Sequence, residues 1–238
     1  MTYFIYRLAA GLAVGAAILI AAPAQAEGMI PATTVVLVHE SEREASLLVR
    51  NDDKTAALLY SSLEDVPEDQ ESLLIVTPPV TRVEPGKSQL VRFILQNREP
   101  LKTQRLKRVT FEGIQPKDPS KSSKVAVTVR QNLPVIIHPK GLPLEREPWK
   151  LLAWTLADGK LTVRNDSPYV VRLAQNLRLL PSDTGAEFPR TYILPGEKIA
   201  IETDAAPTSV EFVPGSLYGF AMPAYQAQIT SAATPATE

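Results

Sequence analysis

The sequence predicts an all-β protein made of two immunoglobulin-like β-sandwich domains. Two observations lead to this prediction. Short runs of β-branched and apolar residues recur along the chain, and turn-forming residues separate them, which is typical of antiparallel sandwiches. Proline occurs 21 times and glycine 11 times in 238 residues. Such a high proline content favours many short strands over long helices, and no run has the period of an amphipathic helix.

The first predicted domain covers residues 27–139. Turn signals divide it, among them Asn-Asp-Asp-Lys at 51–54 and Glu-Pro-Gly at 84–86. The charged run 64–71 is expected to form a solvated loop, and the charged run 102–108 a solvent-exposed edge. The strands expected in this domain are 33–38, 45–49, 56–61, 73–77, 80–83, 89–95, 108–114 and 125–137.

The second predicted domain covers residues 144–231 and follows a turn-rich linker, Pro-Lys-Gly-Leu-Pro. Its turn signals include Asp-Gly at 158–159 and Pro-Gly-Glu at 195–197. Residues 232–238 are expected to form a flexible tail. The strands expected in this domain are 149–155, 160–164, 170–174, 191–194, 198–201, 209–213 and 218–229.

Residues 1–26 have the pattern of a secretory signal. Arg7 is the only charge before Glu27, residues 8–20 are apolar, and Ala-Gln-Ala at 24–26 fits a signal-peptidase site. The apolar run is shorter than the about 20 residues that a membrane-spanning helix needs. We therefore expect a cleaved signal and an exported protein of the bacterial periplasm, without membrane insertion of the mature chain. An uncleaved N-terminal anchor is the alternative.

Composition and motifs argue against several classes of function. Lys and Arg number 25 and Asp and Glu number 26, a balance unlike that of a nucleic-acid binder. Cysteine is absent, which excludes disulfides and thiol chemistry. His39 is expected on the surface at a strand end. His138 is expected to have a packing or hydrogen-bonding role at the domain junction. No hydrolase, zinc or phosphate-loop motif occurs. We expect no enzyme, metal or cofactor.

One stretch carries a resemblance to a known family. Residues 77–92 read Thr-Pro-Pro-Val-Thr-Arg-Val-Glu-Pro-Gly-Lys-Ser-Gln-Leu-Val-Arg. This stretch resembles the signature of the periplasmic chaperones of the chaperone–usher pilus pathway. The segments at 51–54, 133–139, 165–171 and 194–196 are similar to other family motifs, and all of these segments occur in the family order. The resemblance implies two immunoglobulin-like domains in an L-shape, with a cleft that holds a pilus subunit.

The function implied by the resemblance is donor-strand complementation. Such a chaperone binds, folds and caps pilus or fimbrial subunits, and delivers them to an outer-membrane usher. The family's seventh strand fills the groove of a subunit that lacks its own last strand. On that strand the resemblance implies that Val125, Val127 and Val129 enter the groove, because alternate residues point to one face. The alternative is that these valines belong to the domain's own core.

The resemblance also implies that cations grip the C-terminal carboxylate of the subunit, because a desolvated carboxylate must be paired. This chain departs from the family at the two usual basic positions, which hold Thr34 or Val35 and Pro134. His138 and Gly113 stand where the family has an Arg and a Glu of an interdomain ion pair.

Three other arginines are candidate carboxylate anchors. For each of them the alternative is a strand arginine that extends its charged end into solvent. The candidates are Arg92, Arg108 and Arg130.

Two other classes of function stay open at this point. One is an exported β-sandwich protein with an adhesive or structural role, and the other is a periplasmic hydrolase. Self-association of the free chaperone, which would cover its edge strand, is a further open possibility.

Overall fold

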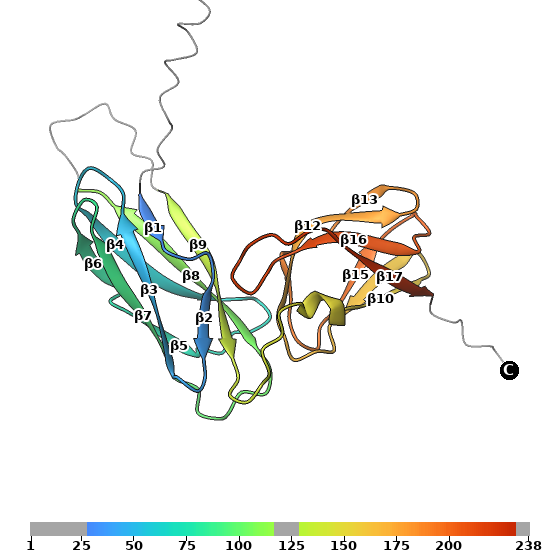
Figure 1. Ribbon diagram of the computed structural model, residues 1–238, viewed down its shortest axis with the longest axis horizontal. Coiled ribbons are helices and arrows are strands. Elements are labelled where there is room, and N and C mark those ends of the chain that lie inside the picture. Colours follow the sequence, from blue (N-terminus) through green and yellow to red (C-terminus); the bar gives the residue numbers. More distant parts are fainter. Residues whose placement is uncertain (1–27, 117–128, 232–238) are drawn as a thin grey trace, which may run out of the picture.

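The computed structural model describes residues 28–116 and 129–231, and shows two β-sandwiches set at an angle to each other (Figure 1). The L-shaped, two-sandwich arrangement agrees with the predicted fold class. Helix is confined, within these residues, to one 3₁₀ turn, η2 (Pro148–Leu151), which lies between the two sandwiches in the sequence.

The first sandwich has two sheets. One sheet has the order β1-β3-β7-β5, and the other has the order β2-β9-β8-β4-β6. Most strands lie where the sequence predicts them, although β4 and β8 extend into the charged runs. The strands are β1 (Met29–Pro31), β2 (Val36–His39), β3 (Glu44–Asn51), β4 (Ala57–Asp65), β5 (Leu74–Thr77), β6 (Val80–Val83), β7 (Ser88–Leu95), β8 (Arg105–Ile114) and β9 (Arg130–His138).

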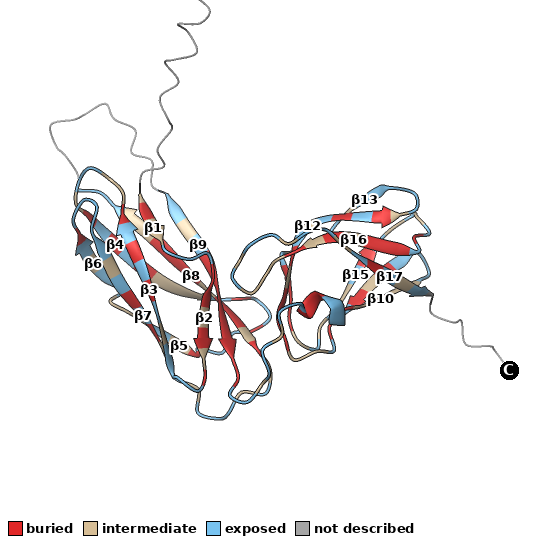
Figure 2. Ribbon diagram, viewed as in Figure 1, coloured by how far each residue is buried: buried red, intermediate tan, exposed pale blue. Residues whose placement is uncertain are grey.

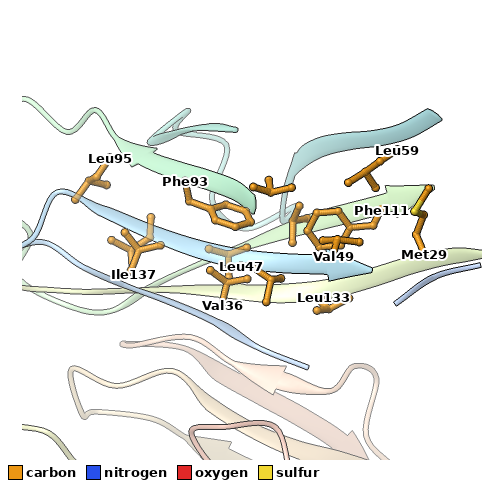
Figure 3. Packing of buried hydrophobic residues seen from close by; sticks show 14 of the residues in the cluster. Met29, Val36, Leu47, Val49, Leu59, Phe93, Leu95, Phe111, Leu133 and Ile137 are labelled. Carbon is orange, nitrogen blue, oxygen red and sulfur yellow. The ribbon is translucent and has the colours of Figure 1, made fainter. Parts of the chain in front are cut away.

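The core of this sandwich lies between the two sheets. Leu47 and Phe93 come from the first sheet, and Phe111 and Ile137 come from the second, as Figure 3 shows. Each is at most 5% exposed. Burying a side chain of this size stabilises the fold by about 1.5–3 kcal/mol. The alternation of buried and exposed residues along β3 and β7 follows from the two-residue period of a strand.

Strand β9 is paired unequally on its two sides. On one side β8 pairs with it from Arg130 to Ile137. On the other side β2 runs parallel to it, but only from Val135 to His138. The neighbouring segment β1 cannot cover the remainder, because it pairs with β3 in the other sheet. Among the strands that the structure describes, residues 130–134 of β9 therefore have a partner on one side only.

The second sandwich is built from one continuous series of strands, in the order β13-β12-β16-β17-β10-β11-β15, with β14 paired to β12. A parallel pairing of β10 with β17 joins its two halves around Trp154, Phe188 and Phe212. The strands are β10 (Ala153–Ala157), β11 (Lys160–Arg164), β12 (Val171–Leu180), β13 (Thr184–Glu187), β14 (Tyr192–Ile193), β15 (Lys198–Glu202), β16 (Ser209–Pro214) and β17 (Tyr225–Ser231).

The charged runs differ from the prediction of a solvated loop and a solvent-exposed edge. Asp69 is 9% exposed and Lys107 is 2% exposed. The ammonium of Lys107 lies 2.9 Å from Asp65 and 3.1 Å from Asp69, and Arg105 also pairs with Asp69. Burial raises the pKa of Asp69, but the hydrogen bonds and charges of Arg105 and Lys107 outweigh it and lower that pKa. The prediction was wrong for Asp69 and Lys107, because the two runs neutralise each other there; most other residues of 64–71 are exposed, as expected of a solvated loop.

Direct contacts join the two sandwiches. Gln104 donates its backbone N–H to the Pro168 carbonyl at 2.8 Å, and its side-chain oxygen accepts the N–H of Val170 at 2.9 Å. His138 lies beside Gln104, with 3.0 Å between Nδ1 and the amide nitrogen, and its Nε2 lies 2.9 Å from the Leu142 carbonyl. His138 thus forms hydrogen bonds at the domain junction, as the sequence indicates.

An ion pair and an apolar cluster complete the junction. Glu68 of the first sandwich pairs with Arg190 of the second, and accepts the Tyr192 hydroxyl at 2.7 Å. Around this pair, buried apolar residues from both sandwiches form one cluster. Figure 2 shows buried segments, in red, on both sides of the joint. The junction therefore has an ion pair, and it uses residues other than the His138 and Gly113 positions.

Candidate functional site

A pocket of about 370 Å³ lies between the two sandwiches. The first sandwich contributes Arg108, on β8, and Asn132, on β9. The second contributes Arg172, on β12, and Thr191. The described lining contains these two arginines and no Asp or Glu. Its volume is at the lower end of the about 300–1,000 Å³ of small-ligand sites, and its charge suits an anion.

Arg108 is held by its neighbour on β9. Its guanidinium donates to the side-chain oxygen of Asn132, and donates to the Asn132 backbone carbonyl at 3.0 Å. Glu64 is the cross-strand partner of Arg108 on β4. The Glu64 carboxylate accepts the Thr110 hydroxyl at 2.7 Å and lies 3.4 Å from the Asn132 amide. Arg108 is thus oriented by a neutral amide and remains available to an anion in the pocket.

Arg172 is a site residue that the sequence prediction missed. Its flanking residues, Val171 and Leu173, are buried in the second core. Its Nη1 is buried and has no hydrogen-bond partner. Burial, and then the charge of Arg108, lower the pKa of this guanidinium. Because an arginine stays charged in proteins, that shift means that the free pocket holds its positive charge at a cost.

The sequence holds no signal that separates Arg172 from other strand arginines. Arg178 lies on the same strand with the same alternation, yet it is exposed and pairs with Asp183 and Glu211. The difference arises from the position of the second sandwich relative to Arg108, which depends on contacts distant in sequence.

Arg92 and Arg130 lie outside the pocket. Arg92 is on β7 in the other sheet, where it pairs with Glu44. Arg130 begins β9, and its guanidinium lies 3.9 Å from Glu64 and 3.8 Å from Glu112. Of the three arginines suggested by the sequence, the structure therefore brings Arg108 alone to the pocket.

Val129 is the one valine of the three expected donor residues that the structure describes. It is 43% exposed and immediately precedes β9. Leu133 and Val135, at two-residue spacing along the same strand, are buried in the core. Val129 therefore lies, beyond Gln131, on the same face of the chain as Leu133 and Val135, past the point where the domain's own core covers it. Val125 and Val127 lie outside the described residues.

The described ranges contain neither a metal-binding cluster nor a membrane-spanning helix. No group of three or more His, Asp or Glu residues is placed there to hold a metal ion. No helix in these ranges is long and apolar enough to cross a membrane.

Comparisons with known proteins identify the family. Residues 28–143 match the model of the pili and flagellar-assembly chaperones, PapD N-terminal domain. The chain is also 48% identical over 197 residues to the uncharacterized fimbrial chaperone YhcA of Escherichia coli K12, which covers 82% of this chain and 88% of the relative. The chain belongs to the fimbrial chaperone family. The family consists of non-enzymatic pilus-assembly chaperones of the periplasm, so the adhesive and hydrolase alternatives are not supported.

More distant fimbrial chaperones share the fold. The chaperone FimB/FhaD of Bordetella pertussis is 28% identical over 195 residues, which is 75% of this chain and 78% of the relative. A solved complex of SafA pilin with the SafB chaperone of Salmonella enterica matches with a TM-score of 0.71 at 17% identity, covering 86% of this chain and 97% of the matched one. The E. coli chaperone DraB gives 0.70 at 20% identity, covering 86% and 100%. These likenesses support the two-sandwich fold.

Proposed function

We propose that this fimbrial chaperone caps pilus subunits by donor-strand complementation and passes them to an outer-membrane usher. The observation that supports this most directly is the one-sided pairing of β9 over residues 130–134, next to the half-exposed Val129. An unpaired edge offers N–H and C=O groups to a guest strand, and its alternate apolar side chains fill the pockets of that partner. The uncovered edge and Val129 are adjacent in the chain.

The free energy of subunit capture comes from strand pairing and from the burial of apolar side chains. Burying a fully exposed valine contributes about 1.5–3 kcal/mol before the cost of ordering the two partners, and Val129, already half buried, contributes less. In this proposal Val125, Val127 and Val129 enter the subunit groove at two-residue spacing. No nucleotide is needed, because a subunit that later receives a better-fitting strand releases the chaperone.

The same proposal includes the export of the chain and its division into domains. Residues 1–26 act as a signal that is removed, which leaves the mature chaperone in the periplasm. Residues 27–139 and 144–231 form the two domains. Arg108 binds the C-terminal carboxylate of the subunit, because it is the sequence candidate that lines the pocket.

Replacing Val129 with Asp tests the donor strand. The variant should fold normally, because Val129 is already half exposed, but it should no longer yield a chaperone–subunit complex, because the carboxylate would be buried without a partner. The matched control is Val80→Asp, at a valine 48% exposed on β6. Each variant is expressed with the fimbrial subunits encoded beside its gene, and the 1:1 complex is quantified in periplasmic extracts. Equal recovery from the two variants would contradict the proposal.

A further inference from the structure

The two arginines of the pocket belong to different domains. Arg108 is on β8 of the first sandwich, and Arg172 is on β12 of the second. Their charges repel, and the described lining supplies no carboxylate to balance them. The buried Nη1 of Arg172 also lacks an acceptor. A buried guanidinium N–H without an acceptor is costly, so a ligand that brings negative charge and acceptors into this pocket contacts both domains at once.

A loop beside Arg172 adds a further contact between the two domains. The Arg172 carbonyl accepts the N–H of Gly215 at 2.8 Å, at the start of the loop that joins β16 to β17. This loop reaches across to the first sandwich, as the dark red segment between the two sandwiches in Figure 1 shows. There the Thr34 hydroxyl donates to the Tyr218 carbonyl at 3.2 Å. The loop is otherwise open to solvent, with Phe220 69% exposed, and its contact adds to those of Gln104 and Glu68 at the junction.

We propose that Arg172 is the second half of the carboxylate anchor, so that the C-terminal carboxylate of a bound subunit bridges the two domains and fixes their relative orientation. This inference rests on the proposed function and adds a residue and a consequence to it. A carboxylate has two oxygens and can accept from two guanidinium groups. Arg108 is held by its hydrogen bonds to Asn132, and Arg172 is held between Val171 and Leu173, which are buried in the second core.

The bridge makes carboxylate affinity and domain orientation depend on each other. In the free protein the like charges favour separation of the two arginines, and the anion removes that repulsion. Because linkage is reciprocal, a change that loosens the domain orientation also weakens carboxylate binding. The loaded chaperone is therefore more rigid at the domain junction than the free one.

The test uses a small peptide without charged side chains in two forms, N-acetyl-trialanine as the free acid, which is an anion, and as its neutral C-terminal amide. Each is titrated into the whole mature protein at constant chloride concentration. Binding is followed by the NMR signals of the arginine side-chain N–H groups, and domain orientation is followed by residual dipolar couplings. The variants are Arg172→Gln and Arg108→Gln, with Arg92→Gln as the control on another sheet.

We expect the free acid to bind and the amide not to bind. Each of the two pocket variants should weaken binding of the acid by roughly 10- to 100-fold, the loss of one charge-assisted hydrogen bond, and Arg92→Gln should leave it unchanged. The couplings of the wild-type protein should fit one fixed domain orientation only when the acid is bound.

Two outcomes would overturn the inference. If Arg172→Gln binds the acid as tightly as the wild type while Arg108→Gln does not, the carboxylate belongs to the first domain, and the proposed function stands without the bridge. If the wild type treats acid and amide alike, or if saturation with the acid leaves the couplings unchanged, there is no bridge. Subunit capture through Val129 is measured separately, so a failure here is distinguishable from a failure of the proposed function.

Discussion

Removing the charge of Asp69 should destabilise the first sandwich in a pH-dependent way. In Asp69→Asn the shape is kept, but Lys107, which is 2% exposed, loses one of its two carboxylates. Breaking an isolated buried pair costs about 3–5 kcal/mol. Here Lys107 keeps Asp65 at 2.9 Å and Arg105 keeps Glu71 at 3.0 Å. We therefore expect a loss of about 2–3 kcal/mol at pH 7.

The pH dependence follows from the lowered pKa of Asp69. A carboxyl whose pKa is lower in the folded state stabilises the fold fully above its unfolded pKa, about 3.9, and this contribution disappears as the pH falls through the folded value. The difference in stability between the wild type and Asp69→Asn should therefore be constant near neutral pH and shrink in acid.

Urea unfolding followed by far-UV circular dichroism measures this difference from pH 7 downward. The matched control is Glu71→Gln, because the Glu71 side chain is 62% exposed and also contacts Arg105; it should cost less than about 1 kcal/mol. Both tryptophans, Trp149 and Trp154, lie in the second sandwich, so the tryptophan fluorescence transition should move less than the dichroism. Equal losses in the two variants, or a loss that is the same at every pH, would refute the reasoning.

Two further substitutions test the interior and the junction. Asn51→Ala should cost about 2–3 kcal/mol in urea unfolding, because the buried amide donates to the Val83 carbonyl at 2.9 Å; a loss below about 1 kcal/mol would mean that the carbonyl finds another donor. Gly219→Ala should change the small-angle scattering curve, because a Cβ there overlaps Thr34. The control Gly196→Ala has a similarly positive φ and open space around it, so an identical curve for the two variants would contradict the reasoning.

The strands were predictable where turn residues bound them on both sides. β6 and β11 begin and end at the predicted residues, because Pro79 and Glu84-Pro85-Gly86 enclose the first, and Asp158-Gly159 and Asn165-Asp166 enclose the second. The prediction of a strand over 218–229 was wrong in its first half, where a loop folds back through a hydrogen bond from Gly219 to Ser216, and β17 begins at Tyr225.

The charged positions were less predictable than the strands. Lys107 and Asp69 read as solvated residues, because the sequence does not show that two opposite runs meet in one buried cluster. Arg108 was among the predicted anchors, and the structure places it in the pocket. Arg172 was not, because its role depends on the angle between two domains, which is set by contacts between residues far apart in sequence, such as Gln104 with Val170.

The uneven cover of β9 also limits how far a guest strand can advance. β2 occupies the edge from Val135 onward, and the residue before it, Pro134, has no amide hydrogen to offer. Pro134 is therefore the last residue of β9 beside which a guest strand can lie. The length and the endpoint of the shared ladder are thus determined by the chaperone, and guests with different sequences would all stop at the same position.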